Sequence, residues 1–362
     1  MSDQQRRFVL RWGVVGLGAF SAKWINDVFS NYQRDAINGA AVTHELKAIV
    51  SSTSLSKAKK FLDLIDTSIA GTPKLYDSYD EFLHDDEIDI VYIAAPNSFH
   101  YPLAQAALQA GKHILVEKTF TINHEQAYEL QKLAADRQLF VLHGVWTRFL
   151  PTTKYIEKLV LENGVIGQVT RVQADLSHDC PFVAENRLFN PELGGGVLFD
   201  NIIYSFTWVD LLLLSQSKSA PRINSWSILS KIVPNIDISS SITLVFDDLE
   251  ATGTATGSFL QESPKYSVLI EGKRGSISID RASRPTKAVI TRADSSEDSI
   301  VELPLIDGLG YYYEANAAAV SIRDKLLEPA EYSFAQTIRT LEIFDQVKTK
   351  NGITYPTSIE RI

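Results

Sequence analysis

Short apolar runs alternate with helix-like patterns over residues 8–143. Strands are predicted for the runs FVLRWGVVG, ELKAIVSS, IVYIAAP, HILVEK and QLFVLHG, which are rich in β-branched and aromatic residues. Between these runs, LSKAKKFLDLI, PLAQAALQAG and EQAYELQKLAADR predict helices, and a further helix is expected over residues 21–30. Strands that alternate with helices of about 10 to 15 residues indicate βαβ units and a parallel sheet.

The pattern changes after about residue 150. Helical segments are predicted to residue 163 and again near residues 198–215. Alternating runs without intervening helices then follow, in the order ITLVFDD, ATGTATGSFL, YSVLIEG, GSISIDRA, KAVITRA and DSIVELP. Such runs are typical of antiparallel strands. We therefore predict an α/β protein, with a Rossmann-type parallel sheet in residues 1–145. An α+β domain with an open, largely antiparallel sheet and C-terminal helices is predicted for residues 146–362.

The composition narrows the class of protein. A chain of 362 residues with 45% hydrophobic and 22% charged residues suits two globular domains. The net charge of -9 argues against nucleic acid as the main partner, because phosphate binding requires a basic surface. No apolar run approaches the roughly 18 residues of a membrane span. The single cysteine, Cys180, fits a reducing compartment. We expect a cytoplasmic protein that binds neither nucleic acid nor membranes.

A glycine-rich turn follows the first predicted strand. Its sequence, Gly16-Leu17-Gly18-Ala19-Phe20-Ser21, has the pattern G-x-G-x-x-S and opens a helix. In this context the glycines allow a tight turn and a close approach of a pyrophosphate to the helix N-terminus. The alternative is a glycine-rich turn without a ligand. We favour dinucleotide binding by Gly16, Gly18, Ala19 and Phe20.

The end of the second strand bears on the choice of cofactor. NAD selectivity usually requires a carboxylate there, which binds the ribose 2′-hydroxyl. This chain instead has Ser51, Ser52 and Thr53, followed by lysines at 57, 59 and 60. Hydroxyl and ammonium groups can accept a 2′-phosphate, so NADP is favoured and NAD is the alternative. The lysines could also be an exposed helix face.

Unusual residues gather where the predicted parallel strands end, and in open sheets ligands bind beyond those ends. They include Ser51, Ser52, Pro96, Asn97, His100, Glu117, Lys118, Trp146 and Arg148. His100 could contact the cofactor ribose. Lys118 could act as a general base or in a proton relay, or it could hydrogen-bond a substrate oxygen. The alternative for Lys118 is a surface ion pair.

A second candidate stretch is LGGGVLFDNIIYSFTW. Asp200 and Tyr204 are four residues apart, so they share one face of the predicted helix. A tyrosine in an apolar site can exchange a proton with an alkoxide, and a lysine nearby would lower its pKa. The alternative is an amphipathic helix with a tyrosine at the edge of the core. The histidines show no paired metal-ligand spacing and one cysteine cannot build a thiolate site, so no metal is expected.

Over essentially its whole length the chain resembles the Gfo/Idh/MocA oxidoreductases. The matching segments are WGVVGLGAFSAKW, AAPNSFHYPLAQAALQAGKHILVEK, WTRFLP, LGGGVLFDNIIY and YYYEANAAAVSIRDKLLEP. Within this family, WTRFLP and the tyrosine that ends the D-x-x-x-Y segment are similar to the branch of dimeric dihydrodiol dehydrogenases and NADP-dependent D-xylose 1-dehydrogenases.

The resemblance implies a role for each matching residue. It implies that Lys118 orients the substrate and relays a proton, that Tyr204 is the acid/base, and that Asp200 is its partner. Asn97 and His100 match contacts on the nicotinamide side of the cofactor, with Pro96 and Glu117 beside them. The substrate pocket is implied to include Trp146, Arg148 and Arg187. Homodimerisation through the C-terminal sheet is also implied.

Two positions depart from the family pattern. Thr119 stands where relatives carry a proline that often follows a cis bond. The sequence leaves open whether the bond before Thr119 is cis, or trans with Lys118 displaced. Ile202 stands where the motif D-x-G-x-Y has a glycine, and in relatives that glycine leaves room near the substrate. Because isoleucine is larger, activity or substrate choice could differ.

The leading hypothesis is an NADP-dependent dehydrogenase that moves hydride between nicotinamide and a hydroxyl-bearing carbon. Its substrate would be a D-xylose-like aldose or a trans-dihydrodiol. One alternative is a catalytically silent, NADP-binding regulatory protein of the same family. Another is an oxidoreductase that acts on a cyclic polyol or a pyrrole-type substrate.

Overall fold

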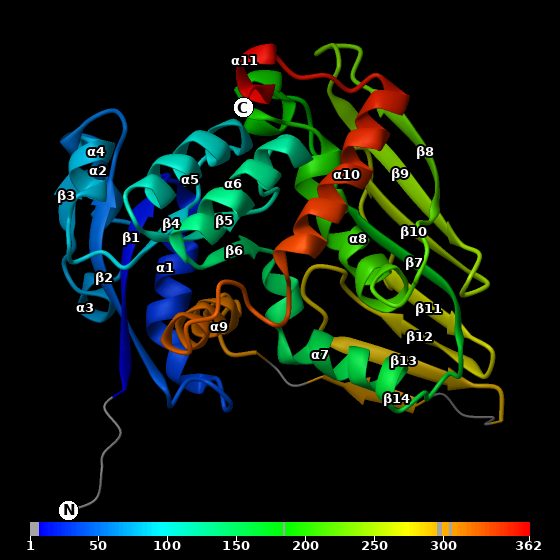
Figure 1. Ribbon diagram of the computed structural model, residues 1–362. Coiled ribbons are helices and arrows are strands. Elements are labelled where there is room, and N and C mark those ends of the chain that lie inside the picture. Colours follow the sequence, from blue (N-terminus) through cyan, green and yellow to red (C-terminus); the bar gives the residue numbers. More distant parts are fainter. Residues whose placement is uncertain (1–6, 184, 295–298, 304–305) are drawn as a thin grey trace, which may run out of the picture. The chain divides into compact units, whose positions relative to one another are not determined.

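The computed structural model describes residues 7–183, 185–294, 299–303 and 306–362 (Figure 1). Two compact units are present. The first contains the chain up to Trp146, Ile306–Thr340 and the last two residues. The second contains the chain from Thr147 to the residues before Ile306, together with Leu341–Glu360. The predicted domain boundary at residues 145/146 stays a prediction, but residues 306–340, expected in the C-terminal domain, lie in the first unit.

The first unit is built on a parallel sheet of six strands in the order β3-β2-β1-β4-β5-β6. The strands are β1 (Phe8–Val15), β2 (Val42–Val50), β3 (Lys74–Tyr76), β4 (Ile90–Ile93), β5 (His113–Glu117) and β6 (Val141–Gly144). The order reverses between β1 and β4, which is the switch point where open α/β sheets bind ligands. The predicted Rossmann-type sheet is therefore confirmed; the short strand β3 was not predicted.

The first unit also contains helices. They are α1 (Ala19–Asn31), η1 (Tyr32–Arg34), α2 (Leu55–Leu62), α3 (Thr67–Ala70), α4 (Tyr79–Leu83), η2 (Asn97–Phe99), α5 (His100–Gln109), α6 (His124–Arg137) and α9 (Tyr312–Arg323). Four of those described, α2, α3, α4 and α6, begin at a polar side-chain cap. The side chain of Ser54 accepts a hydrogen bond from the Lys57 amide at the start of α2. Asn123 does the same for Gln126 at the start of α6. Such caps satisfy amides that have no partner within the helix.

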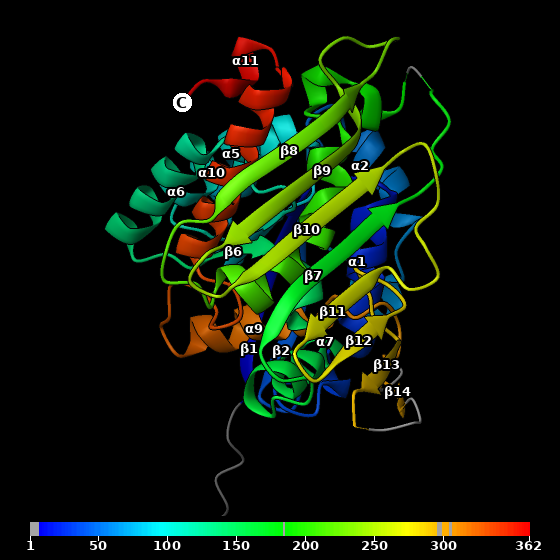
Figure 2. The ribbon, with the colours of Figure 1, turned by 90° about the vertical axis from the view of Figure 1, so that its right-hand side faces the viewer.

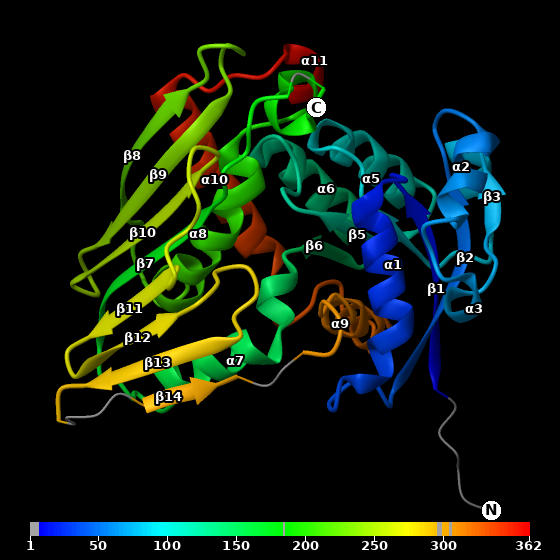
Figure 3. The ribbon, with the colours of Figure 1, turned by 180° about the vertical axis from the view of Figure 1, so that it is seen from behind.

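Helix α9 lies beside α1 in the first unit (Figure 3). The carboxylate of Asp27 on α1 is buried and binds the segment at the start of α9. Its oxygens accept hydrogen bonds from the backbone amides of Leu309, Gly310 and Tyr311, at 2.5, 2.9 and 2.8 Å. Burial raises the pKa of Asp27, and the three hydrogen bonds from backbone amides act in the opposite direction, so they offset part of the cost of burying its charge. These bonds explain why a C-terminal segment belongs to the N-terminal unit.

A buried histidine also connects α9 to the sheet. The indole N–H of Trp12 donates to Nδ1 of His44 at 2.8 Å, and Nε2 of His44 lies 2.8 Å from Oδ1 of Asn316. Because Nδ1 accepts, the proton of the neutral ring is assigned to Nε2, which donates to the amide oxygen. Burial lowers the pKa of His44 to about 4, so the ring is neutral at physiological pH.

The second unit holds an eight-stranded sheet in the order β14-β13-β12-β11-β7-β10-β9-β8 (Figure 2). The strands are β7 (Val169–Ser177), β8 (Arg222–Leu229), β9 (Asp237–Phe246), β10 (Ala251–Ser258), β11 (Val268–Gly272), β12 (Gly275–Ile279), β13 (Lys287–Arg292) and β14 (Ser299–Glu302). Strands β7 and β10 pair in parallel, and the other described pairs of this sheet are antiparallel. The predicted, largely antiparallel sheet is confirmed, but β7 and β8 were missed.

The helical segments of this part of the chain are η3 (Trp146–Phe149), α7 (Pro151–Glu157), η4 (Lys158–Glu162), η5 (Arg187–Phe189), η6 (Pro191–Leu193), η7 (Leu198–Ile202), α8 (Ile203–Val209), η8 (Asp210–Leu214), α10 (Phe334–Asn351) and α11 (Thr357–Glu360). Segments η7, α8 and η8 pack on the eight-stranded sheet, and α8 lies on β7 and β10. Segments η4, η7 and η8 are π-helical, and α10 is divided between the two units.

One helical stretch of the described chain, Pro191–Leu214, is long and apolar enough to span a membrane, which the sequence analysis did not find. Its most apolar window is 94% buried inside the fold, as is usual for a core helix. The burial gives its apolar side chains a protein environment.

The neutral state of His44 predicts a pH-dependent stability. The unfolded chain protonates this ring near pH 6.5, whereas the folded chain does so at about 4, so the stabilisation is complete above pH 6.5 and is lost as the pH falls toward 4. The lost free energy of unfolding is on the order of 3 kcal/mol. We expect His44→Gln to flatten the dependence of unfolding free energy on pH between 4.5 and 7. The exposed His84 provides the control, since His84→Gln should leave this slope unchanged. Equal slopes in wild type and His44→Gln would contradict the assignment.

Candidate active site

The turn after β1 has the geometry of a dinucleotide-binding turn. Gly16 has a φ of 93°, and a Cβ at this position would lie 2.4 Å from the backbone of Ala94, which follows β4. Only glycine combines this φ with so close an approach of two backbone segments. At Gly18, by contrast, an added Cβ would meet no atom of the described chain within 4 Å. The space above Gly18 is thus open to a ligand.

Ser21, which stands in the third glycine position of the motif, also forms hydrogen bonds within the turn. Its buried hydroxyl lies 2.7 Å from the carbonyl of Gly16 and 2.9 Å from that of Gly18, and it accepts a hydrogen bond from the Gly18 amide at 3.0 Å. The hydroxyl therefore ties the turn to the first residues of α1. The pattern G-x-G-x-x-S indicated a small residue here but not these bonds.

The end of β2 offers hydroxyl groups to a ligand. Ser51 is buried, and its Oγ accepts from the backbone amides of Thr53 and Ser54 at 3.3 and 3.4 Å. Ser52 and Thr53 are exposed, as is Lys57 on the first turn of α2. Cationic and hydroxyl groups at this edge fit a phosphate on the ribose 2′-oxygen.

His100 joins the segments that follow β4 and β5. Its ring is fully buried, with Nε2 2.8 Å from the carbonyl oxygen of Ala95 and Nδ1 2.9 Å from that of Thr119. The peptide bond between Lys118 and Thr119 is cis, which settles the alternative that the sequence left open. The histidine predicted to contact the cofactor thus also holds the segment that carries Lys118. Pro96 and the buried Asn97 lie in the other of these two segments, between β4 and α5.

Glu117, which precedes Lys118, belongs to a buried network of hydrogen bonds and stacked rings that the sequence did not predict. The hydroxyl of Tyr92 on β4 donates to Oε1 of Glu117 at 2.7 Å, and the Tyr92 ring stacks on Trp24 with centroids 4.1 Å apart. The Trp24 indole in turn donates to Oε1 of Glu314 on α9 at 3.2 Å. Burial, and then the charge of Glu117, raise the pKa of Glu314 well above its usual value. The protonated form of Glu314 is thus favoured over its charged form relative to a carboxyl in water.

Three aromatic residues, Phe20, Tyr311 and Trp146, pack on one another at the sheet edge beside the glycine turn. The ring of Phe20 meets that of Tyr311 edge-on with centroids 5.4 Å apart, and Tyr311 packs on Trp146 at 4.6 Å. Phe20 remains 37% exposed, whereas Trp146 is 8% exposed. This part of the edge gives a ligand an apolar surface, and the predicted residues Phe20 and Trp146 both belong to it.

In the second unit the triple-glycine loop leads into the helix that carries Asp200 and Tyr204. Asp200 forms an ion pair with Arg187 at 2.9 Å, and Arg187 is half-exposed. Tyr204 lies one turn further along the helix and is 7% exposed. The structure thus brings together three residues that the sequence analysis singled out, Arg187, Asp200 and Tyr204, on neighbouring segments.

Arg148 has a different environment. It is 3% exposed, and its guanidinium forms an ion pair with the fully buried Asp210 of η8. This pair lies within the core of the second unit, where each charge offsets the burial of the other. The predicted contact of Arg148 with a substrate stays a prediction.

Ile202, which departs from the family pattern, packs on the sheet. It is fully buried, and a Cβ on Gly257 of β10 would lie 2.9 Å from its Cγ1. Its neighbour Asn201 donates to the carbonyl of Leu176 on β7 at 3.0 Å. A glycine on the strand therefore accommodates the larger side chain on the helix.

The predicted residues fall into two sets. Those from Gly16 to Trp146 lie at the carboxyl edge of the six-stranded sheet, whereas Arg148, Arg187, Asp200 and Tyr204 belong to the second unit. The roles assigned to both sets, including the joint action of Lys118 and Tyr204, remain predictions. Among the described residues, no group of three or more histidine, cysteine, aspartate or glutamate side chains could hold a metal ion.

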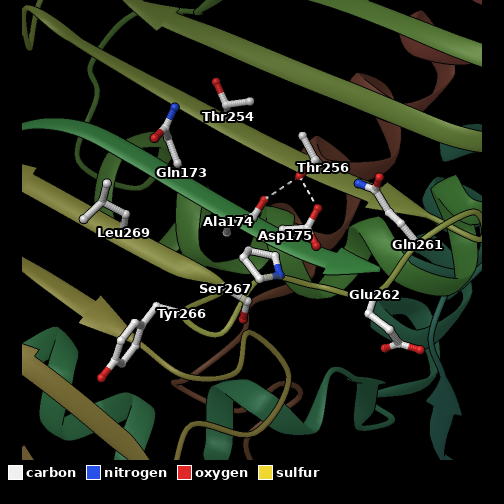
Figure 4. A pocket seen from close by; sticks show the side chains of 11 residues that line it. Gln173, Ala174, Asp175, Thr254, Thr256, Gln261, Glu262, Tyr266, Ser267 and Leu269 are labelled. Atoms are coloured by element: carbon white, nitrogen blue, oxygen red, sulfur yellow. Dashed lines mark hydrogen bonds between the residues drawn. The ribbon is translucent and has the colours of Figure 1, made fainter. Parts of the chain in front are cut away.

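A shallow hollow of about 640 Å³ lies elsewhere, on the outer face of the eight-stranded sheet (Figure 4). The carboxylate of Asp175 at its floor accepts hydrogen bonds from the hydroxyls of Ser177, Thr256 and Ser263 at 3.0, 2.6 and 2.8 Å. Its lining includes none of the site residues predicted from the sequence. The hollow is therefore separate from the residues predicted to form the active site.

Sequence comparison gives matches over nearly the whole chain. Residues 10–145 match the oxidoreductase family with an NAD-binding Rossmann fold, and residues 158–278 match the GFO/IDH/MocA C-terminal domain. A D-xylose 1-dehydrogenase (NADP(+)) of Hypocrea jecorina is 32% identical, over 96% of this chain and 94% of that protein. A trans-1,2-dihydrobenzene-1,2-diol dehydrogenase of Danio rerio is 26% identical, over 96% of this chain and 98% of its own length.

Solved structures share the fold. The 3-ketoreductase KijD10 of Actinomadura kijaniata, in complex with NADP and TDP-benzene, gives a TM-score of 0.77 at 22% identity. That match covers 94% of this chain and 97% of the other. An aldose-aldose oxidoreductase of Caulobacter crescentus gives a TM-score of 0.78 at 20% identity, over 95% of this chain and 97% of the other.

The matched ranges include the turn at Gly16, the Glu117-Lys118 pair and the helix of Asp200 and Tyr204. This chain belongs to the Gfo/Idh/MocA oxidoreductase family.

Proposed function

We propose that the protein is an NADP-dependent dehydrogenase that acts on a hydroxyl-bearing carbon of an aldose such as D-xylose, or of a trans-dihydrodiol. The observation that carries this proposal is the shared carboxyl edge of β1, β4 and β5, where the Gly16 turn follows β1 and Glu117-Lys118 ends β5, with β4 between them. The substrates named for the relatives from Hypocrea jecorina and Danio rerio support the choice of substrate class.

The chain's own residues fit NADP. The open space above Gly18 and the first amides of α1 suit a pyrophosphate, which helix N-termini favour. The exposed Ser52, Thr53 and Lys57 suit a 2′-phosphate, and no carboxylate stands between Ser51 and Ser54 to repel it. When bound, NADP supplies a nicotinamide carbon that accepts or releases hydride.

The protein would supply the proton transfer. We assign Tyr204 as the group that takes the proton of the substrate hydroxyl during oxidation and returns it during reduction. Lys118 would hydrogen-bond the same oxygen and favour its alkoxide form by its positive charge. Asp200 and Arg187, paired with each other, would hold the polar side of the substrate.

We further propose that two copies associate through the outer face of the eight-stranded sheet. Its outermost strand, β8, exposes Trp226 and Ile228 by 52% and 47%. Strands β10 and β7, which lie beyond β9 in the same sheet, present hydroxyl and amide side chains around the hollow at Asp175 (Figure 4). An apolar patch beside polar groups that can pair is a typical composition for an interface between subunits.

A cytoplasmic location is also proposed. It rests on the single cysteine, Cys180, which is an unpaired thiol in the structure and fits a reducing compartment. The net charge of -9 supports a small-molecule substrate in preference to nucleic acid. Microscopy of a fluorescent fusion in the source cells would test the location.

Alanine substitutions of Gly16 and Gly18 should distinguish an effect on stability from an effect on cofactor binding. Gly16→Ala should lower stability and NADPH affinity together, because its Cβ would overlap the backbone at Ala94. Gly18→Ala should leave thermal stability nearly unchanged but weaken NADPH binding by about tenfold or more, roughly 1.4 kcal/mol. Thermal unfolding and NADPH fluorescence titrations measure both quantities. Wild-type affinity in Gly18→Ala would place the pyrophosphate elsewhere.

Turnover tests the catalytic assignment. With NADP and a panel of aldoses and trans-dihydrodiols, we expect reduction of NADP by the wild type and a weaker reaction with NAD. Lys118→Ala and Tyr204→Phe should each lower kcat by about 10² to 10⁴. The matched controls are Lys273→Ala and Tyr155→Phe, which change exposed side chains.

Two outcomes would go against this assignment. Undiminished turnover in both Lys118→Ala and Tyr204→Phe would sink the mechanism. Tight NADPH binding without turnover on any member of the panel would instead support a regulatory protein.

The dimer is tested by molecular mass in solution. Light scattering should give twice 40.3 kDa for the wild type and 40.3 kDa for the double variant Trp226→Asp/Ile228→Asp. Ile37→Asp is the control, since Ile37 is 82% exposed in the first unit and should leave the dimer intact. A monomeric wild type at micromolar concentration would refute the proposed association.

A further inference from the structure

The triple-glycine loop before the Asp200 helix is held by backbone bonds to its own neighbours. The amides of Gly195 and Gly196 donate to the carbonyls of Asn190 and Leu188 at 3.0 and 2.9 Å. A Cβ on Gly195 would lie 2.6 Å from the carbonyl oxygens of both Arg187 and Leu188. The loop is therefore packed so closely that its position and that of Arg187 are coupled.

Asp237, at the start of β9, holds the other side of the loop. It is fully buried, and its Oδ2 accepts hydrogen bonds from the Leu198 amide at 2.9 Å and from the Ser240 hydroxyl at 2.7 Å. A Cβ on Gly196, whose φ is 115°, would lie 2.3 Å from Oδ1 of Asp237. Glycine at this position thus lets the carboxylate reach the first amides of the helix.

This contact replaces a local helix cap. Val197, which stands before the helical segment, has no polar side chain to accept an amide. A carboxylate supplied from another strand satisfies such an amide and interacts favourably with the positive end of the helix dipole. Asp237 therefore caps the helix from a position about 40 residues further along the chain.

Tyr355, near the C-terminus, holds the carbonyl side of the loop. Its hydroxyl donates to the carbonyl of Gly195 at 2.7 Å, and its ring stacks on Phe199 with centroids 5.3 Å apart and an interplanar angle of 12°. Asp237 and Tyr355 thus fix the loop through its amide and carbonyl groups respectively. Both come from segments outside the loop and the helix.

The helix so fixed carries the proposed catalytic residues. The amide of Asp200 donates to the carbonyl of Gly196 at 3.1 Å, and Tyr204 lies one turn later. A shift of the loop would therefore move Asp200, its partner Arg187 and Tyr204 together. Misplacement of a reacting group by about 1 Å can lower a rate by about a hundredfold.

We propose that Asp237 is a positioning residue for the reaction, whose carboxylate fixes the triple-glycine loop and through it the place of Asp200 and Tyr204. The proposal rests on the proposed function for its effect on turnover. Its structural part, the capping of the Leu198 amide by Asp237, does not depend on that function.

Kinetics of two variants test the effect on the reaction. Asp237→Ala removes the acceptor for the Leu198 amide and should lower kcat by about tenfold or more, with the KM for NADP within about twofold of wild type. Asp237→Asn keeps an oxygen acceptor of the same shape and should recover most of the lost kcat. Ile242→Val is the control, because it removes a buried methylene from the same strand without touching the loop.

Hydrogen exchange of the intact protein tests the cap without turnover. Peptides covering residues 197–204 should exchange faster in Asp237→Ala, and at nearly the wild-type rate in Asp237→Asn and Ile242→Val. Unchanged exchange and unchanged kcat in Asp237→Ala would overturn the proposal, as would equal losses of kcat in all three variants. If the wild type shows no turnover, the proposed function fails, and the exchange result still decides whether Asp237 fixes the helix.

Discussion

The pairing of β1 with β2 on one side and β4 on the other is the constraint on which the cofactor edge depends. Because the strand order reverses there, the segments that follow β1 and β4 separate to opposite faces and leave their ends open to a ligand. Gly16 is required where these segments approach, since its Cβ would overlap the backbone at Ala94. The same edge extends through β4 to β5, and so the topology of the sheet places Lys118 on the edge that also carries the Gly16 turn.

Buried polar groups fix the parts of the molecule that this edge requires. Asp27 binds the amides before α9, His44 connects Trp12 to Asn316, and Asp237 caps the helix of Asp200. In each case a side chain from one segment satisfies a group on a distant segment. An unpaired buried polar group is unfavourable, so each of these contacts specifies one arrangement of the chain over others.

The sequence predicted the alternating strands and helices of the first unit because their apolar residues repeat with clear periods. It did not predict β8, whose exposed face carries Trp226 and Ile228 while Ser225 and Ser227 lie on the other face, so that its pattern is not that of an amphipathic strand. Strand β7 was also not predicted, although its polar Arg171 and Gln173 alternate with the buried Val172 and Ala174. Gly16, Gly18, Lys118 and Tyr204 could be predicted as site residues, because each belongs to a sequence motif or follows a predicted strand. The bonds of Ser21 and the cap by Asp237 could not, because no local pattern records a contact between distant segments.

The return of α9 to the first unit affects how the chain becomes folded during synthesis. Asp27, Trp24 and His44 obtain their partners from Leu309, Glu314 and Asn316, almost three hundred residues later in the chain. A nascent chain that has emerged from the ribosome only to Trp146 possesses every strand of the parallel sheet but none of these partners. The hydrogen bonds that Asp27 and the Trp24 indole make in the folded protein can therefore form only after residues 309–314 have been translated.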